Sequence, residues 1–242
     1  LELKDAVEDS YGNIYYLYVS SMNSTYMYLL TDPTNDTSYI KRYQYSDYSK
    51  FINSPLYYDS KTDSLWLASF DSDMSFVNFS VFEKPSAATS NPNPYKISYD
   101  DIDSSITSCQ AFAVKEDNIY IAYNNSNILL TKKNDSSNTK ASISLSNITP
   151  ALSGEVTDMA VLEDGTVAVL VNDKNLNPAN QFTLTDGCTV YSRGALVLLS
   201  SDLSTYKVYG WTDSPRTISA TGSSSDYDVQ WDKITAYIPE YA

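Results

Sequence analysis

The chain repeats one short pattern five times, and this repeat constrains the fold more than any other feature of the sequence. Each copy has an apolar strand, a polar turn carrying Asp, Asn or Gly, and a second strand rich in β-forming residues. The first apolar residue after each turn marks a copy, and the markers are Ile14, Leu65, Ile119, Val167 and Ile234. They lie 51, 54, 48 and 67 residues apart. A period of about 50 residues indicates a repeat architecture in which each unit buries a face against its neighbour.

Two further strands are expected after each of the first four hairpins. The third strands are expected at 26–30, 76–82, 127–132 and 194–200, and the fourth at 39–45, 95–98, 141–145 and 205–211. Four strands in a unit of about 50 residues, joined by short polar turns, is the layout of a β-propeller blade. We therefore expect an all-β propeller or partial propeller with four to five four-stranded blades. The expected blades are 1–50, 51–104, 105–152 and 153–225, with the start of a fifth at 226–242.

The last spacing is longer than the others, and the fifth copy is short. An insertion near 172–187, where Asn, Pro and Asp are concentrated, accounts for the extra length. The fifth copy begins near Val229, so about two strands fit before the last residue. Either the segment 1–7 completes this blade, or the chain is a fragment of a longer protein. The alternative fold is a β-sandwich, or two small ones, which requires no period. Helices should be scarce, with 47–52 the one candidate for a helical turn.

Two hairpins carry a resemblance to a known class of repeats. The run Asp-Gly-Thr-Val-Ala-Val-Leu-Val at 164–171 and the run Glu-Asp-Asn-Ile-Tyr-Ile-Ala at 116–122 resemble the inner hairpins of β-propeller repeats. Such repeats occur in exported bacterial proteins and surface lipoproteins. The resemblance implies a propeller domain outside the cytoplasm and leaves the function open, because propellers serve many functions.

Charge and composition exclude several classes of function. The chain has 16 Lys and Arg, 30 Asp and Glu, a formal net charge of −14 and no His. Negative charge repels phosphate backbones, so we expect no nucleic-acid partner. Without His, catalytic Ser-His-Asp and Cys-His sets and His-based zinc sites are excluded. No apolar run approaches the roughly 18 residues of a membrane span, so no transmembrane segment is expected. The wealth of Ser, Thr and Asn favours an exported protein, extracellular, periplasmic or at the cell surface.

Carboxylates and cysteines supply the candidate metal and covalent sites. The densest acidic groups, Asp71 with Asp73 and Asp100 with Asp101 and Asp103, are weak candidates for Ca²⁺ because carboxylate oxygens suit this ion. Neither group has the spacing of a calcium loop, and solvated acidic turns are the alternative, so no cofactor is expected. Cys109 and Cys188 could form one disulfide in an oxidising compartment, or remain two buried thiols.

Tyrosine is the most informative surplus, with 22 residues in the chain. Alternation along a strand turns some of these rings outward, where a flat apolar face and a hydroxyl suit sugars and protein surfaces. The alternative is that they fill the interfaces between blades. The candidate ligand-binding residues are Tyr57, Tyr58, Trp66, Tyr120 and Tyr123.

The function expected from the sequence is an exported, surface-associated binding or scaffolding domain. It would engage a protein or glycan partner through the propeller loops and exposed Tyr and Trp residues, and no catalytic residue is assigned. One alternative is a polysaccharide-acting glycosidase or lyase that pairs two carboxylates. Another is a structural subunit of an envelope or filament assembly, in which a neighbouring chain completes the last blade by strand addition. The sequence leaves the oligomeric state open.

Overall fold

The fold was analysed in a computed structural model of the chain. It describes residues 2–19, 25–30, 40–45, 51–70, 77–85, 95–99, 108–135, 139–172, 181–184, 189–192, 194–209, 216–218 and 227–229. Within these ranges the regular structure is β-strand, apart from 3-10 structure at Leu145–Asn147 and at residue 85. The expectation of an all-β chain is therefore confirmed. In the described residues no helix has the length and apolar character needed to cross a membrane.

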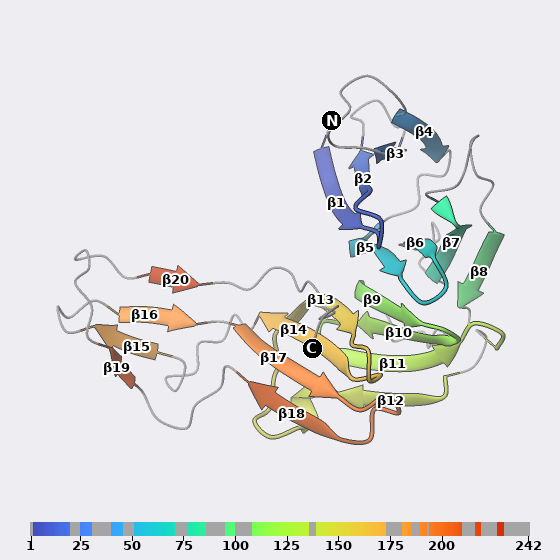
Figure 1. The fold of residues 1–242 in the computed structure, drawn as a ribbon. Helices are drawn as coiled ribbons and strands as arrows, with labels where there is room; N and C mark the ends of the chain where they lie inside the picture. The colour runs from blue at the N-terminus through green and yellow to red at the C-terminus, as the bar shows by residue number, and fades with distance from the viewer. Residues whose placement is uncertain are drawn as a thin grey trace.

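Four antiparallel sheets follow one another along the chain (Figure 1). The first holds β1 (Glu2–Glu8), β2 (Ile14–Val19), β3 (Thr25–Leu30) and β4 (Ile40–Tyr45). The second holds β5 (Phe51–Asp59), β6 (Ser64–Phe70), β7 (Val77–Glu83) and β8 (Tyr95–Tyr99). The third holds β9 (Cys109–Lys115), β10 (Asn118–Tyr123), β11 (Asn127–Lys132) and β12 (Ala141–Ser144). The fourth holds β13 (Glu155–Val161), β14 (Val167–Asn172), β17 (Gly194–Leu199) and β18 (Tyr206–Tyr209).

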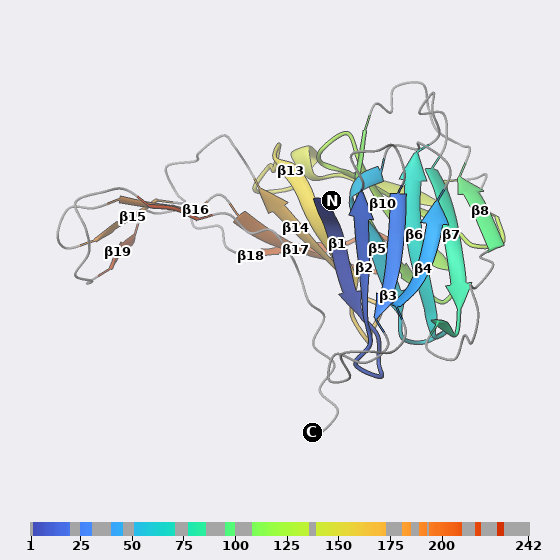
Figure 2. The ribbon, with the colours of Figure 1, turned by 90° about the horizontal axis from the view of Figure 1, so that it is seen from above.

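The expected third and fourth strands of each unit are confirmed, with small shifts at their ends. The insertion expected near 172–187 leaves the fourth sheet after β14. Its strands β15 (Gln181–Leu184) and β16 (Thr189–Ser192) form a small sheet with β19 (Arg216–Ile218) and β20 (Tyr227–Val229). Both edge strands of this small sheet pair in parallel. Figures 1 and 2 show it standing away from the other sheets.

The structure bears on three expectations: the role of segment 1–7, the fifth copy of the repeat and the helical turn at 47–52. The hypothesis that segment 1–7 completes the last unit is wrong, because this segment lies in β1 and pairs with β2. Of the fifth copy, residues 230–242 lie outside the described residues, and β20 pairs with β16. The proposed helical turn at 47–52 is also corrected: Phe51 and Ile52 belong to β5, while 47–50 lie outside the described residues.

The first strands of the four sheets lie beside one another. β1 neighbours β5, β5 neighbours β9 and β9 neighbours β13. A parallel bridge between Ser54 and Ala111 joins the second and third sheets into one eight-stranded sheet. We call β1, β5, β9 and β13 the innermost strands. Because side chains alternate across a strand, each sheet offers one face to the sheet before it and one to the sheet after it.

Three apolar clusters fill the spaces between successive sheets. Tyr15 and Leu17 of the first sheet pack with Leu56, Leu65 and Leu67 of the second. A second cluster joins the other face of the second sheet to the third, and a third cluster joins the third sheet to the fourth. Residues on alternate positions of one strand therefore belong to different clusters, which explains why several strands are apolar on both faces.

One tight turn recurs between the first two strands of a sheet. In the first sheet the amide of Gly12 donates to the carbonyl of Asp9, and in the fourth the amide of Gly165 donates to that of Leu162. Both glycines have a positive φ, 82° and 88°, in the left-handed region that a Cβ disfavours. The glycine of the polar turn seen in the sequence is therefore required by the backbone conformation at that position.

Candidate functional site

Two of the aromatic residues expected to bind a ligand lie in the core. Trp66 is 0% exposed, its ring meets Phe79 edge-on at 5.8 Å, and its Nε1 donates to Ser64 Oγ at 2.9 Å. Tyr120 is 1% exposed, and its hydroxyl donates to the carbonyl of Ser201 at 2.9 Å. Neither ring has a face open to a ligand, so the structure corrects this expectation and assigns both residues to packing between sheets.

The other three aromatic candidates are half-buried; Tyr57 and Tyr123 contact neighbouring sheets, and Tyr58 bonds within its own hairpin. The Tyr57 hydroxyl accepts the amide N–H of Val161 at 3.3 Å, which links the second sheet to the fourth across the third. Its ring is tilted against Phe112 at 5.9 Å. Tyr58 donates its hydroxyl to Asp63 Oδ1 at 2.8 Å, and Tyr123 packs against the cluster between the second and third sheets. The structure therefore places Tyr57 and Tyr123 at sheet interfaces and Tyr58 at its own turn, not together on one binding surface.

Burial changes the acidity of these phenols. Desolvation is the main reason that the pKa of Tyr57 is raised to about 12, and it is also the main reason that the pKa of Tyr58 is raised to about 12. Desolvation, and the bond to the Asp9 carboxylate, raise the pKa of Tyr15 as well. Desolvation likewise raises the pKa of Tyr120. Each shift favours the neutral phenol in the folded state.

We expect the protein to unfold in alkali through these tyrosines. A raised folded-state pKa gives stability that is fully present below the ordinary value of 10.0 and is lost as the pH rises toward about 12. Tyrosinate absorbance should rise first for the exposed phenols, and the remaining phenols should ionise together with the loss of far-UV circular dichroism. A single titration near the ordinary pKa, with the fold intact, would contradict the burial of Tyr15, Tyr57 and Tyr120.

The candidate calcium ligands and one cysteine cannot be placed. Asp71, Asp73, Asp100, Asp101 and Asp103 lie outside the described residues, so the calcium hypothesis stays a prediction. Within the described ranges, no group of three or more Asp, Glu, Cys or His side chains could hold a metal.

Cys109 is buried at the start of β9 and is a free thiol in the structure, and desolvation raises its pKa. Cys188 lies outside the described residues, so the two alternatives of the sequence, a disulfide with Cys109 or two buried thiols, stay predictions.

A pair of buried aspartates on the innermost strands was missed by the sequence analysis. Asp5 in β1 is 7% exposed and Asp158 in β13 is 6% exposed. Each follows an irregularity in strand pairing, and each Oδ1 accepts the amide N–H of the next residue, at 2.8 Å and 2.9 Å. The signal was in the sequence as two related runs, Glu-Leu-Lys-Asp at 2–5 and Glu-Val-Thr-Asp at 155–158.

The buried carboxylates among the described residues accept hydrogen bonds that hold strands and turns in place. Asp5 Oδ2 accepts the amide N–H of Leu56 at 2.9 Å and so ties the first sheet to the innermost strand of the second. Asp59 accepts the amide of Lys61 at 3.0 Å and the hydroxyl of Thr62 at 2.6 Å. The Asp9 carboxylate accepts four bonds from its own hairpin, including one from the buried hydroxyl of Tyr15 at 2.6 Å. A buried carboxylate requires such donors to offset its desolvation.

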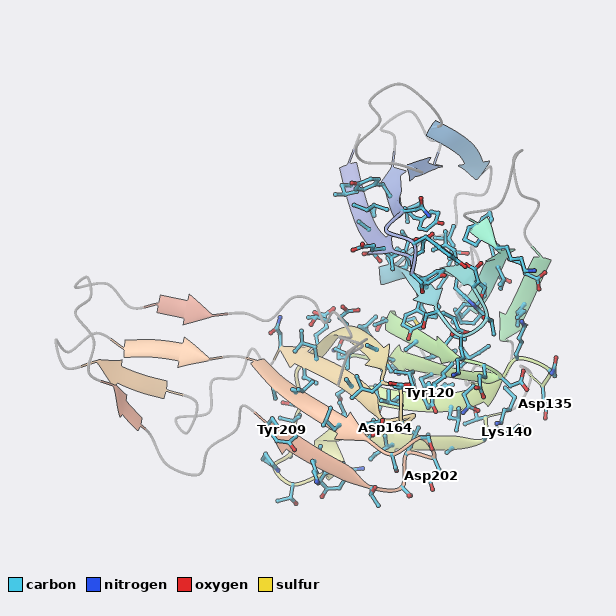
Figure 3. All side chains as sticks on the ribbon, viewed as in Figure 1. Tyr120, Asp135, Lys140, Asp164, Asp202 and Tyr209 are labelled. Carbon is cyan, nitrogen blue, oxygen red and sulfur yellow. The ribbon has the colours of Figure 1, made fainter. Side chains whose placement is uncertain are left out.

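Exposed carboxylates gather at the turns of the third and fourth sheets. The ammonium of Lys115 donates hydrogen bonds to the carbonyls of Leu162 and Glu163, so the turn after β9 lies next to the turn after β13. Figure 3 shows Asp164 and Asp202 at the same end of the fourth sheet. We call this surface the acidic rim; its exposed members are Glu116, Asp117, Glu163, Asp164 and Asp202.

Hydrogen bonds keep two carboxylates of the acidic rim ionised. The hydroxyls of Ser200 and Ser204 lower the pKa of Asp202 to about 2. The hydrogen bond from the backbone amide of Thr166 is the main cause that lowers the pKa of Asp164. Both groups therefore carry full negative charge at neutral and mildly acidic pH.

Comparison with known proteins gives no family. No family model matches the chain, and no curated protein sequence matches it. Among solved structures, the exo-β-1,3-galactanase of Phanerochaete chrysosporium, solved with galactose, has a TM-score of 0.42 and 9% sequence identity. The match covers 84% of this chain and 48% of the galactanase chain, so this chain spans less than half the length of that structure.

Proposed function

We propose that this chain is a propeller-type binding or scaffolding domain, exported from the cell, whose partner is a protein. In this proposal the four consecutive four-stranded sheets are the blades, and the neighbouring positions of β1, β5, β9 and β13 in that order support it. The resemblance of the hairpins to propeller repeats of exported bacterial proteins supports this architecture and location, as does the Ser-, Thr- and Asn-rich composition.

The use of the buried carboxylates is the observation that carries the proposal. Hydrolysis of a glycosidic bond needs two carboxyl groups that face a substrate. Asp5, Asp9 and Asp59 instead direct their oxygens to amides and hydroxyls of the framework. The same groups stiffen the turns and tie the blades, which is what a scaffold that presents its surface to a partner requires.

The acidic rim indicates the chemistry of the partner. Five exposed carboxylates lie on adjacent turns, and the ammonium of Lys115 between these turns is held by two backbone carbonyls. A complementary potential speeds and orients association, so a protein with a basic surface fits this rim. Among the aromatic candidates for glycan stacking, Trp66 and Tyr120 are buried and offer no face to a sugar.

A binding comparison between two charge-matched variants tests this proposal. The rim variant carries Glu116→Gln, Asp117→Asn and Asp164→Asn, which remove three negative charges from exposed turns. The control carries Ser146→Lys, Asn147→Lys and Ser153→Lys, which add three positive charges at exposed residues near the link between β12 and β13. Envelope proteins captured by the wild-type chain at low salt should be lost with the rim variant and retained by the control.

Three outcomes would overturn the proposal. Equal capture by both variants would show that the acidic rim does not select the partner. Release of reducing sugar from a panel of polysaccharides, abolished by substitution of one acidic residue, would establish the glycan-acting alternative. Sedimentation of the purified chain as a large assembly would favour the structural subunit.

A further inference from the structure

The acidic rim is built from turns of two different sheets, so its shape depends on how those turns are held together. Glu116 and Asp117 belong to the turn after β9 in the third sheet, whereas Glu163 and Asp164 belong to the turn after β13 in the fourth. Asp202 lies in a further turn of the fourth sheet, between β17 and β18. Among the described strands, none of the third sheet pairs with a strand of the fourth. The relative position of the carboxylates therefore depends on side-chain contacts between the two sheets.

Lys115 makes the contact between the turn after β9 and the turn after β13. It is the last residue of β9, it is half-buried, and its Nζ donates to the carbonyl of Leu162 at 2.7 Å and to that of Glu163. The carbonyl of Leu162 also accepts the amide N–H of Gly165 at 3.0 Å, which closes the turn. Hydrogen bonds from a charged donor are stronger than those between neutral groups. One ammonium group therefore holds the turn that carries Glu163 and Asp164 against the end of β9.

A second side chain of the third sheet holds the other turn of the acidic rim. The Tyr120 hydroxyl donates to the carbonyl of Ser201, which precedes Asp202, at 2.9 Å. Leu203 of the same turn is 4% exposed and belongs to the cluster between the third and fourth sheets. Gly165 lies against this turn, because a Cβ at Gly165 would be 3.6 Å from the Cβ of Ser201. The three turns of the acidic rim are therefore packed together, and Figure 3 marks two of their carboxylates.

The charge of Lys115 is opposite to that of the acidic rim, and this separates its two possible roles. The hydrogen bonds of Thr166 are the main cause that lowers the pKa of Asp164, and the positive charge of Lys115 adds to the effect. If charge alone governed binding, loss of Lys115 would strengthen the capture of a basic partner, because the rim would become more negative. If position governs binding, the same loss weakens capture, because the turns must then be ordered when the partner binds.

We propose that Lys115 is the positioning residue of the acidic rim, and that its ammonium holds two turns in the arrangement that a basic partner recognises. Lys115 bonds to backbone carbonyls of the turn after β13, so it acts on the carboxylates through the backbone that carries them. The inference rests on the proposed function, since it requires that the acidic rim capture a partner.

Two variants with the same change in charge test this proposal. Lys115→Met removes the ammonium and both of its hydrogen bonds. Lys61→Met removes one positive charge from the exposed turn after β5, where the lysine side chain makes no hydrogen bond or ion pair within the described residues. The envelope protein that the wild-type chain retains most strongly should dissociate at least about fivefold faster from Lys115→Met. It should bind Lys61→Met as tightly as the wild type or more tightly.

A conservative variant and a flexible probe separate position from charge. Lys115→Arg should restore capture of the envelope protein, because a guanidinium also donates to carbonyls. A decalysine peptide, which responds to charge and adapts its shape, should bind Lys115→Met at least as tightly as it binds the wild type. Weaker binding of both probes to Lys115→Met would contradict a role in positioning and indicate a general loss of structure.

Measurements on the protein alone distinguish failure of this inference from failure of the proposed function. In Lys115→Met the amides of Leu162 and Gly165 should exchange at least about threefold faster, while the first and second sheets keep their protection. The pKa of Asp164 should rise, because a nearby positive charge is lost, and Lys61→Met should change neither quantity. Lys115→Gln, a second uncharged variant, should behave like Lys115→Met.

The outcomes separate as follows for the two proposals. Unchanged exchange in the turn after β13, or unchanged or tighter binding of the envelope protein by Lys115→Met, would overturn the role of Lys115 and leave the proposed function standing. Equal capture by the rim variant and its control would overturn the proposed function, and with it the role of Lys115 in capture, even where the exchange rates and the pKa of Asp164 change as expected.

Discussion

Asp9→Ala should lower the free energy of unfolding by about 3–5 kcal/mol, because the change leaves several donors unpaired at once. Asp9 Oδ1 accepts the amides of Tyr11 and Asn13, and Oδ2 accepts Asn13 Nδ2 and the Tyr15 hydroxyl. Tyr15 is 0% exposed, so its hydroxyl has no water to replace the lost acceptor. Urea denaturation followed by circular dichroism measures the change.

Asp164→Ala is the matched control for this prediction. Asp164 lies in the same type of turn in the fourth sheet, but it is exposed and its Oδ1 accepts the amide of Thr166 at 2.9 Å. Its loss should destabilise the protein far less than that of Asp9, because water replaces the lost acceptor at this exposed turn. Equal effects of the two substitutions would show that the buried bond to Tyr15 contributes little.

Trp66→Ala should destabilise the protein by about 3–5 kcal/mol, the range for removal of a large buried aromatic side chain. The substitution leaves a cavity between the second and third sheets, removes the edge contact with Phe79, and leaves Ser64 Oγ without the indole donor. Thermal and urea denaturation should both report the loss. Partner binding, measured on the folded fraction, should keep its wild-type affinity.

Tyr11→Ala separates packing from surface effects. Tyr11 is 69% exposed at the first turn, so its removal should change the free energy of unfolding by less than about 0.5 kcal/mol. A Trp66→Ala protein with wild-type stability and lost affinity would restore Trp66 to a binding role and contradict its place in the core.

The strands could be predicted from the sequence because the residues that define a hairpin lie within a short stretch of the chain. Alternation and turn residues located β11 at 127–132, and Gly12 and Gly165 occupy turns that need a positive φ. The site was harder to predict. An aromatic residue on a strand has the same sequence pattern whether its ring faces solvent or a second sheet, so the sequence predicts a binding role for Trp66 and Tyr120 that their burial corrects. Sheet stacking alone decides between these environments.

The sequence by itself determined the all-β class, the period of the hairpins and the insertion before β17, since each depends on neighbours along the chain. The tertiary structure decided which sides of those strands are buried. It placed the Tyr57 hydroxyl on an amide 104 residues away and the Asp5 carboxylate on an amide 51 residues away. Such contacts depend on how one sheet lies against the next. The burial of side chains and the pairing of charges follow from that arrangement, which cannot be derived from a local sequence pattern.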